Sequence, residues 1–463
     1  MTTTLVAPSA IADLLQQQRE FFATGVTRED EFRLTQLKNL RQAVVRHQDE
    51  IVEAARIDLG RPAFEGYFEV GVISELDHAI KHLRAWMRPR KVSLPLNQKP
   101  GSAWVQPEPL GVVLVIGPWN YPFQLIISPL IGVIAAGNCA ILKPSEYAPA
   151  TSQMLAKLVA EIFDPAHVAL VEGGVETAQA LLAERFDHIL FTGGERVGKV
   201  VMQAAAQHLT PVTLELGGKS PCIVTPDIDL AVTARRIVWG KFLNAGQTCI
   251  APDYLLVHES IKPALVEALK QRIQDCYGDN PAQSPDLSRI VNEAQFDRLV
   301  GLLDRGNVLI GGDHSRPDRF IAPTLIDGLT WDDPIMQEEI FGPLLPILTY
   351  RTLDEAITAI NQRPKPLTVY LFSKDKSAQD KVLHQTTAGS LCINDVILQG
   401  AVWDLPFGGV GKSGIGHYHG PHSFNTFSHL KGVLKKPFWM DLNWRYPPYE
   451  GKVDLFKRFI GLS

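Results

Sequence analysis

The sequence is poor in cysteine, in excess positive charge and in long apolar runs. Its five cysteines include no Cys-x-x-Cys pair and are odd in number, which favours a reducing compartment over a disulfide scaffold. The formal net charge of −5 argues against a general nucleic-acid binder, because such a protein needs a basic face. No basic segment with a long apolar core opens the chain, and the apolar stretch 125–136 is too short to span a membrane. We therefore expect a soluble cytoplasmic protein without a nucleic-acid partner.

The chain is long and has ordinary globular composition. Its 463 residues are 45% hydrophobic and 21% charged. This length exceeds what one compact core usually holds, so two or more domains are expected. Residues 27–58 follow the apolar spacing of a helix, with Thr27 as a plausible cap.

From about residue 110, short apolar strands alternate with helical stretches. Strands are expected at 112–116, 138–142 and 187–191, and helices at 150–163 and 176–184. A second alternating region, from about 220 to 395, has expected strands at 222–224, 254–257, 367–371 and 391–393. This alternation predicts an α/β fold with a doubly wound, Rossmann-like parallel sheet. Ligands of such sheets bind beyond the carboxyl ends of the strands.

Cys249 stands in a polar segment, Asn244-Ala-Gly-Gln-Thr-Cys249, and Glu215 precedes it in Leu214-Glu-Leu-Gly-Gly-Lys219. A thiol with a carboxylate base suggests covalent catalysis at a carbonyl carbon. The alternative is an inert, buried thiol, which is the commoner fate of a lone cysteine. These two residues alone do not decide between the readings.

Gly193-Gly-Glu-Arg-Val-Gly198-Lys199 follows an expected strand and opens an expected helix. Glycines let a phosphate approach the backbone, and the amides at a helix start bind it. Gly193, Gly194, Val197 and Gly198 are therefore candidate cofactor contacts. The segment is not GxGxxG, and a P-loop needs a hydroxyl where Val200 stands, so a P-loop nucleotide hydrolase is the less favoured alternative.

Two further motifs follow the first two expected strands. Lys143 and Glu146 could hold the hydroxyls of an adenosine ribose, with a solvated turn as the alternative. Asn120, in Pro118-Trp-Asn-Tyr-Pro122, could donate its amide to an oxyanion, an effect worth ~3 kcal/mol, with a structural role as the alternative. The histidines of 417–422 lack other ligand types at metal-binding spacing, so no metal site is expected.

Seven motifs, in order along most of the chain, resemble the aldehyde dehydrogenase superfamily. They occupy 118–122, 143–146, 191–199, 214–219, 246–254, 338–343 and 406–409. Residues 247–254, 416–429 and 445–449 are similar to its class 3 branch, which includes the fatty aldehyde dehydrogenases.

The resemblance implies a catalytic sequence. Cys249 attacks the aldehyde to form a thiohemiacetal, while the Asn120 amide and the Cys249 backbone N–H hold the oxyanion. Hydride passes to a nicotinamide and leaves a thioester. Glu215 then activates water, or helps to take the thiol proton, and an acid is released.

The resemblance also implies the cofactor contacts. Lys143 and Glu146 grip the adenosine ribose, Glu339 holds the nicotinamide ribose, and Phe341 packs beside the nicotinamide ring. One position departs from the family: Gly194 stands where members commonly carry a hydroxyl residue. This leaves the strength of the cofactor grip in question. Glu146 should repel a 2′-phosphate, so NAD is expected, with NADP also accepted.

The expected domains follow from these observations. Residues 1–93 and 108–213 form the NAD(P)-binding domain with an N-terminal helical part, and 214–395 form the catalytic domain. The segments 94–107 and about 420–440 form a small oligomerisation extension, and 441–463 a C-terminal tail. Tyr121 and Trp403 are candidates for the substrate pocket because of their neighbours.

On a helix, the tail 453–462 places its apolar residues on one half and Asp454, Lys457 and Arg458 on the other. It either docks on its own protein or lies on a membrane surface. The expected enzyme is a homodimer that oxidises hydrophobic aldehydes, whether aliphatic, aromatic or polyene. A catalytically silent relative is the other alternative, opposed by the joint presence of Cys249, Glu215 and Asn120.

Overall fold

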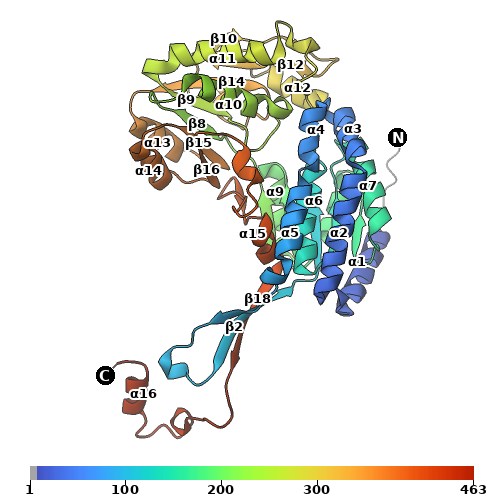
Figure 1. The fold of residues 1–463 in the computed structure, drawn as a ribbon, viewed down its shortest axis with the longest axis vertical. Helices are drawn as coiled ribbons and strands as arrows, with labels where there is room; N and C mark the ends of the chain where they lie inside the picture. Colours follow the sequence, from blue (N-terminus) through green and yellow to red (C-terminus); the bar gives the residue numbers. More distant parts are fainter. Residues whose placement is uncertain (1–7, 463) are drawn as a thin grey trace.

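The computed structural model describes residues 8–462, in which a six-stranded sheet forms the centre of the N-terminal half (Figure 1). Its order is β17-β7-β6-β3-β4-β5, and only the edge strand β17 is antiparallel. The strands are β3 (Val112–Ile116), β4 (Cys139–Lys143), β5 (Val168–Leu170), β6 (His188–Thr192), β7 (Val212–Glu215) and β17 (Gly414–Ile415). All residues of β3, β4 and β6 are buried, as expected of parallel strands covered on both faces.

A second sheet, of seven strands, has the order β10-β13-β14-β9-β8-β15-β16. It is parallel except for the edge strand β10. Its strands are β8 (Pro221–Val224), β9 (Tyr254–His258), β10 (Asn307–Ile310), β13 (Thr324–Asp327), β14 (Leu344–Tyr350), β15 (Thr368–Phe372) and β16 (Ser390–Ile393). A separate hairpin pairs β11 (His314–Ser315) with β12 (Phe320–Ile321). The two regions of alternating strands and helices are thus confirmed as two α/β layers.

Helices cover the sheets. In the first half they are α1 (Pro8–Ala23), α2 (Asp30–Arg46), α3 (Gln48–Leu59), α4 (Ala63–Val70), α5 (Val72–Trp86), α6 (Gln124–Ala136), α7 (Pro149–Ile162), α8 (Val175–Ala183) and α9 (Glu195–Ala206). In the second half they are α10 (Leu230–Phe242), α11 (Lys262–Tyr277), α12 (Glu293–Val300), α13 (Leu353–Asn361), α14 (Lys376–Gln385) and α15 (Gly420–Thr426).

One helix expectation is wrong. Residues 27–58 form two helices rather than one, and Thr27 caps neither, because it lies buried in a short 3-10 helix, Val26–Arg28. The break falls at His47, whose ring nitrogens contact the carboxylates of Glu50 at 2.9 Å and Glu161 at 2.8 Å. Periodicity does not reveal this break, because the apolar face continues across it.

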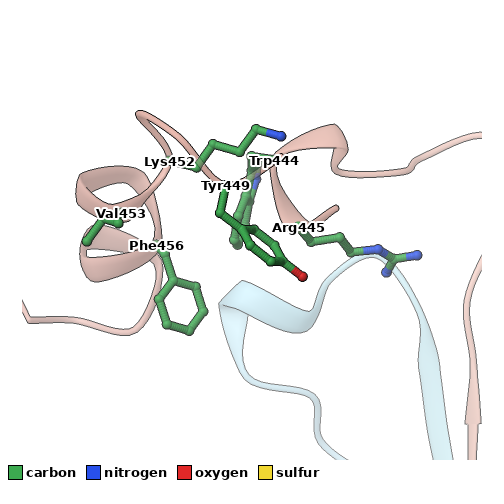
Figure 2. A pocket seen from close by; sticks show the side chains of 6 residues that line it. All are labelled: Trp444, Arg445, Tyr449, Lys452, Val453 and Phe456. Atoms are coloured by element: carbon green, nitrogen blue, oxygen red, sulfur yellow. The ribbon is translucent and has the colours of Figure 1, made fainter. Parts of the chain in front are cut away.

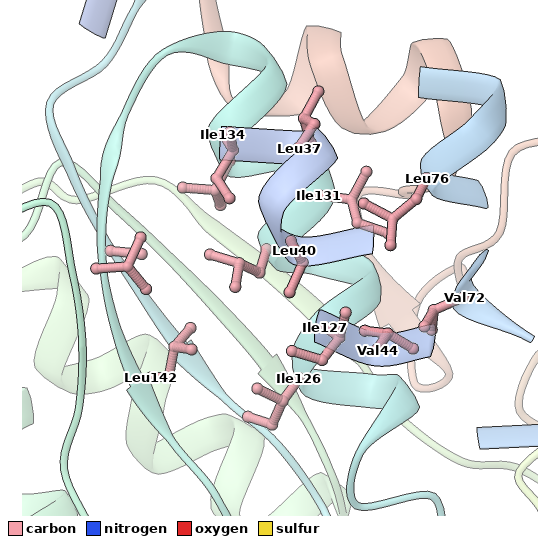
Figure 3. Packing of buried hydrophobic residues seen from close by; sticks show 14 of the residues in the cluster. Leu37, Leu40, Val44, Val72, Leu76, Ile126, Ile127, Ile131, Ile134 and Leu142 are labelled. Atoms are coloured by element: carbon pink, nitrogen blue, oxygen red, sulfur yellow. The ribbon is translucent and has the colours of Figure 1, made fainter. Parts of the chain in front are cut away.

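The core of the first half lies between α6, its neighbouring helices and the sheet. Figure 3 shows Leu37 and Leu40 of α2, Leu76 of α5, and Ile127 and Ile131 of α6 packed together. Each of these side chains is at most 2% exposed. Their burial fixes the N-terminal helices and α6 against one face of the six-stranded sheet.

A third sheet joins β1 (Arg90–Val92), β2 (Ser102–Pro109) and β18 (Ser428–Lys435), with β2 and β18 paired antiparallel over eight residues. In Figure 1 it projects from the main body as a stalk that leads to α16 (Val453–Phe459). Trp444, Tyr449 and Phe456 line a hollow of about 430 Å³ within this tail (Figure 2). Among residues 8–462, no helix is long and apolar enough to cross a membrane.

Candidate active site

Four motifs meet at one edge of the six-stranded sheet. β7, β6, β3 and β4 are neighbouring parallel strands, so their carboxyl ends lie side by side. Glu215 ends β7, the glycine turn follows β6, the Asn120 segment follows β3, and Lys143 ends β4. Three of these motifs follow strands expected from the sequence, and the strand order places them and Glu215 at the same edge.

The Asn120 segment lies against the Cys249 segment. The side-chain amide of Asn120 donates to the Gln247 carbonyl at 3.0 Å, and the hydroxyls of Tyr121 and Thr248 lie 2.9 Å apart. Asn120 is 3% exposed and Tyr121 is 8% exposed. The structure thus brings the candidate oxyanion donor to the residues directly before the candidate nucleophile.

The backbone before Cys249 has an unusual conformation. Asn244 and Ala245 both have φ of 52°, and Gly246 has φ of 75°. A Cβ on Gly246 would lie 2.2 Å from the Gly342 carbonyl oxygen, so the segment passes against the backbone that follows Phe341. Left-handed non-glycine residues store about 1–3 kcal/mol each and concentrate at functional sites.

The Cys249 residue is partly exposed, and Glu215 beside it is 3% exposed. Burial, followed by the charges of Glu339 and Glu215, raises the pKa of Cys249 to about 12. Burial also raises the pKa of Glu215 well above its usual range, and both of its carboxyl oxygens are buried without a partner. The thiol must lose its proton before it can attack, and a carboxyl with a raised pKa is suited to accept a proton from water.

Glu339 lies against the loop that follows β7. A Cβ on Gly217 would lie 1.8 Å from its Oε2 atom, so only glycine admits the carboxylate there. Burial, followed by the charge of Asp253, raises the pKa of Glu339 to about 8, opposed by a hydrogen bond from the Gly218 N–H. Among the charged groups near Cys249, Glu339 and Glu215 are the two that the sequence already singled out.

Phe341 and Lys143, which are both predicted to contact the cofactor, each contact another residue of a predicted motif. The Phe341 ring contacts Trp119 edge-on with centroids 5.3 Å apart, which links the 338–343 motif to the Asn120 segment. Lys143 is 3% exposed, and its Nζ lies 3.1 Å from the Glu146 carboxylate. The lysine and glutamate are thus presented together at the end of β4.

The glycine turn after β6 leads directly into α9, with Gly194 as the residue before the helix. A Cβ on Gly198 would lie 2.7 Å from Leu216, so glycine lets α9 pack closely against the chain after β7. Gly194 is the N-cap of α9 with φ of −77°, and a Cβ there would meet nothing within 4 Å. Val197 is 43% exposed on the same helix. Packing therefore does not require a glycine at position 194, where members of the similar family commonly carry a hydroxyl residue.

A cleft of about 1030 Å³ runs from Gly194 past Gly217 to Glu339. Its lining includes the basic side chains of Lys219, Arg298 and Lys412. The size, the helix start and the basic groups fit a dinucleotide with its pyrophosphate.

The second pocket candidate, Trp403, lies farther along the chain. Its indole N–H donates to Ser74 at 3.1 Å, and its ring lies 5.1 Å from the His419 ring. His419 in turn contacts Glu75 through Nδ1 at 3.0 Å. Tyr418 lies close enough to Glu215 for that charge to help raise its pKa, after burial as the main cause. Trp403 thus belongs to an aromatic cluster next to Tyr418.

Sequence reasoning missed the residues that support these groups. Thr248 contacts Tyr121, and the buried pair Arg61–Glu69 contacts the Asn120 segment. Glu65 contacts the backbone N–H of Asn244. The only sequence signal is the turn Gly60-Arg61-Pro62 before an acidic helix, and it does not indicate what these side chains reach.

Comparison with known proteins agrees with this geometry. The model of the aldehyde dehydrogenase family matches residues 9–433. The 4,4′-diaponeurosporen-aldehyde dehydrogenase of Staphylococcus aureus is 47% identical, over 96% of this chain and 97% of its own length. A dimeric NADP-preferring aldehyde dehydrogenase of Rattus norvegicus is also 47% identical, over 96% and 99%.

Solved structures give the same result. The substrate-bound state of Staphylococcus aureus AldH superposes with a TM-score of 0.94 at 46% identity, over 97% of this chain and 99% of that one. The NAD-dependent aldehyde dehydrogenase of Sinorhizobium meliloti superposes with a TM-score of 0.85 at 29% identity, over 94% and 89%. The expected fold class is thereby confirmed, and the P-loop hydrolase is excluded. The chain belongs to the aldehyde dehydrogenase family and is an NAD(P)-dependent enzyme that oxidises aldehydes.

Proposed function

We propose that Cys249 is the nucleophile, Asn120 the oxyanion donor and Glu215 the base. The thiol of Cys249, which is partly exposed, releases its proton to solvent and bonds to the aldehyde carbon. The Asn120 amide and the Cys249 N–H donate to the oxygen that becomes negative. Bound NAD(P) supplies the acceptor for the hydride that leaves this carbon, so the adduct becomes a thioester. Glu215 takes a proton from water, which attacks the thioester and releases the carboxylate and the thiol.

The observation that carries this proposal is the contact between the two catalytic segments beside an unpartnered carboxyl. The Asn120 amide is 3.0 Å from the carbonyl of Gln247, two residues before Cys249. Glu215 offers two buried oxygens without partners. A carboxyl in that state accepts a proton readily, because its charged form lacks stabilising groups.

For the cofactor, we infer that Lys143 and Glu146 hold the adenosine ribose and that Glu339 holds the nicotinamide ribose. Gly193, Gly194, Val197 and Gly198 are assigned to the pyrophosphate. The carboxylate of Glu146 opposes a 2′-phosphate by charge repulsion, so NAD is preferred and NADP is accepted more weakly. The contact of Phe341 with Trp119 supports a place for Phe341 beside the nicotinamide ring.

The proposed substrates are hydrophobic aldehydes of medium or long chain, including aromatic and polyene ones. The name of the Staphylococcus aureus relative denotes activity on a polyene aldehyde. Aromatic rings lie near the site in this chain, among them Tyr121, Tyr418 and Trp403.

A panel of aldehydes from C2 to long polyenes, followed by NADH absorbance, tests the substrate class and the mechanism together. Cys249→Ala is the control and should show no turnover. Turnover that survives this substitution would refute the nucleophile assignment. A clear preference for C2 or C3 aldehydes would refute the substrate class.

We also propose a homodimer in which the stalk of β1, β2 and β18 forms the oligomerisation extension of an otherwise two-domain subunit. The rat relative is named as dimeric, and most side chains of β18 are exposed. Sedimentation equilibrium measures this directly, and a monomer at micromolar concentration would contradict the proposal.

The cytoplasmic enzyme is further proposed to contact membranes peripherally through its tail. Phe438, Trp439 and Leu462 are at least 71% exposed, and Lys457 and Arg458 close the last turn of α16. Such a combination of apolar and basic groups favours an anionic lipid surface. Flotation with anionic vesicles should recover the full chain more than a version that ends at Tyr449, and the variant F438S/W439S should also float less. Equal flotation of all three would refute this contact.

A further inference from the structure

Arg61 and Glu69 form an ion pair in the dry interior next to the site. Arg61 Nη1 lies 2.6 Å from Glu69 Oε1, and both side chains are 0% exposed. Gly60, with φ of 60°, ends α3, and Pro62 precedes α4, so Arg61 lies in a fixed turn between the two helices. A buried pair of this kind seldom adds net stability, because both charges lose their hydration. Its other contacts indicate what it does.

The pair contacts both ends of the segment that carries Asn120. Arg61 Nη2 donates to the Asn120 carbonyl, and Glu69 Oε2 accepts from the Gln124 N–H at 2.7 Å, at the start of α6. The guanidinium also lies over the Tyr121 ring, 4.6 Å from its centroid. A planar guanidinium that is held by a carboxylate has little freedom. The main chain around Asn120 is therefore fixed by groups from the N-terminal helices.

Glu65 lies one helical turn before Glu69 on the same face of α4. Its Oε2 accepts from the Asn244 N–H at 2.9 Å and from the Ser288 hydroxyl at 3.1 Å. Asn244 is the first left-handed residue of the Cys249 segment, and its side-chain amide donates to the Asn120 carbonyl at 3.0 Å. Glu65 thus supports the other catalytic segment.

Two carboxylates four residues apart on one helix face repel each other, and α4 has only eight residues. Burial raises the pKa of Glu65 and of Glu69, because loss of hydration disfavours each charged carboxylate, so this arrangement is costly. A costly arrangement that contacts both catalytic segments is better explained by positioning than by stability.

We propose that α4 is the positioning element of the catalytic centre. Glu69 with Arg61 fixes the segment of Asn120, and Glu65 fixes the segment that leads to Cys249, so that the amide and the sulfur keep their relative places. Arg61, Glu65 and Glu69 are positioning residues that act through the two segments. The inference rests on the proposed oxyanion role of Asn120.

The first test is a double-mutant cycle between Arg61 and Asn120. Arg61→Met should lower kcat by about 10- to 100-fold in the wild-type background, with the KM for NAD unchanged within about twofold. In the Asn120→Ala background the same change should lower kcat by less than about threefold, because the group that Arg61 positions is gone. Arg61→Lys keeps the positive charge but lacks the planar guanidinium with its paired donors, so it should restore only part of the lost kcat. Glu53→Gln, on the exposed part of α3, is the control and should leave kcat unchanged.

The outcomes separate this inference from the proposed function. Equal losses from Arg61→Met in both backgrounds would mean a general structural role and would overturn the inference. Normal kcat in Asn120→Ala alone would instead refute the proposed oxyanion role. If Arg61→Met does not fold, the variant R61M/E69M removes both charges and should fold. Wild-type kcat in that folded variant would also overturn the inference.

A separate measurement, the rate at which Cys249 is alkylated, tests the role of Glu65. Glu65→Met should slow the alkylation of Cys249 by iodoacetamide, measured on the Cys249 peptide, by about tenfold at constant pH. Cys276 and Cys392, which are partly exposed, provide internal controls, because they lie outside the segment that Glu65 supports. An unchanged alkylation rate in a folded variant with reduced kcat would refute this part of the proposal.

Discussion

Gly217→Ala should weaken cofactor binding without destabilising the protein. The added Cβ would lie 1.8 Å from Glu339 Oε2 and 2.5 Å from its Cδ atom, so the carboxylate must move. Because these atoms are the end of a flexible side chain, the backbone can stay in place. Hydrogen bonds to a charged group contribute about 1.5–3 kcal/mol. Loss of the proposed bonds to the nicotinamide ribose should therefore raise the Kd for NAD by about 10- to 150-fold.

The assay is NAD binding by titration calorimetry, with thermal unfolding measured on the same samples. Gly174→Ala is the matched control, because a Cβ at Gly174 meets nothing within 4 Å, and its Kd and Tm should match the wild type. Gly217→Ala should keep its Tm within about 2 °C. An unchanged Kd, or a weaker Kd accompanied by a large fall in Tm, would refute the reasoning about Glu339.

Three further predictions concern residues at the same edge of the sheet. Glu215→Gln should abolish turnover yet raise the Tm. The pKa of Glu215 is higher in the folded state than in the unfolded state, so the wild type loses stability as the pH rises from about 4.5 through the folded pKa. The Tm difference between variant and wild type in thermal scans should therefore grow between pH 4.5 and 8, and a constant difference would contradict this. Glu146→Gln should narrow the ratio of kcat/KM for NAD over NADP by removing charge repulsion, and an unchanged ratio would argue against its ribose role. Gly194→Ser should lower the Kd for NAD by about 2- to 10-fold through one added hydrogen bond, since the serine Cβ fits without contact, and a raised Kd would mean that the turn excludes a hydroxyl.

The sequence predicts the fold in the regions where buried apolar strands alternate regularly with helices. Apolar runs such as 112–116 are strands because both faces of the sheet are covered. Boundaries are less accurate: the strand expected at 138–142 is observed at Cys139–Lys143, and the Asn138 side chain accepts from the N–H groups of Leu110 and Gly111. The helix break falls at His47, whose ring contacts Glu161, a residue far away in the sequence.

The site was predictable where motifs follow parallel strands. Strand order brings Glu215, Asn120 and Lys143 to one edge, and the family motifs name Cys249. The contacts of Arg61 with the Asn120 segment could not be predicted, because a charged residue in a turn looks exposed in sequence and is 1% exposed in the fold. Positioning residues of this kind depend on tertiary contacts that no local pattern encodes.

The central claim is that Cys249 carries the acyl group during turnover. Glu215→Gln should retain acylation and lose hydrolysis, so rapid quenching after addition of NAD and a long-chain aldehyde should trap the thioester. Peptide mass spectrometry should find the acyl mass on the peptide that contains Cys249, at close to one per active site. Absence of that adduct during a measurable burst of NADH, or its presence on another residue, would contradict the account.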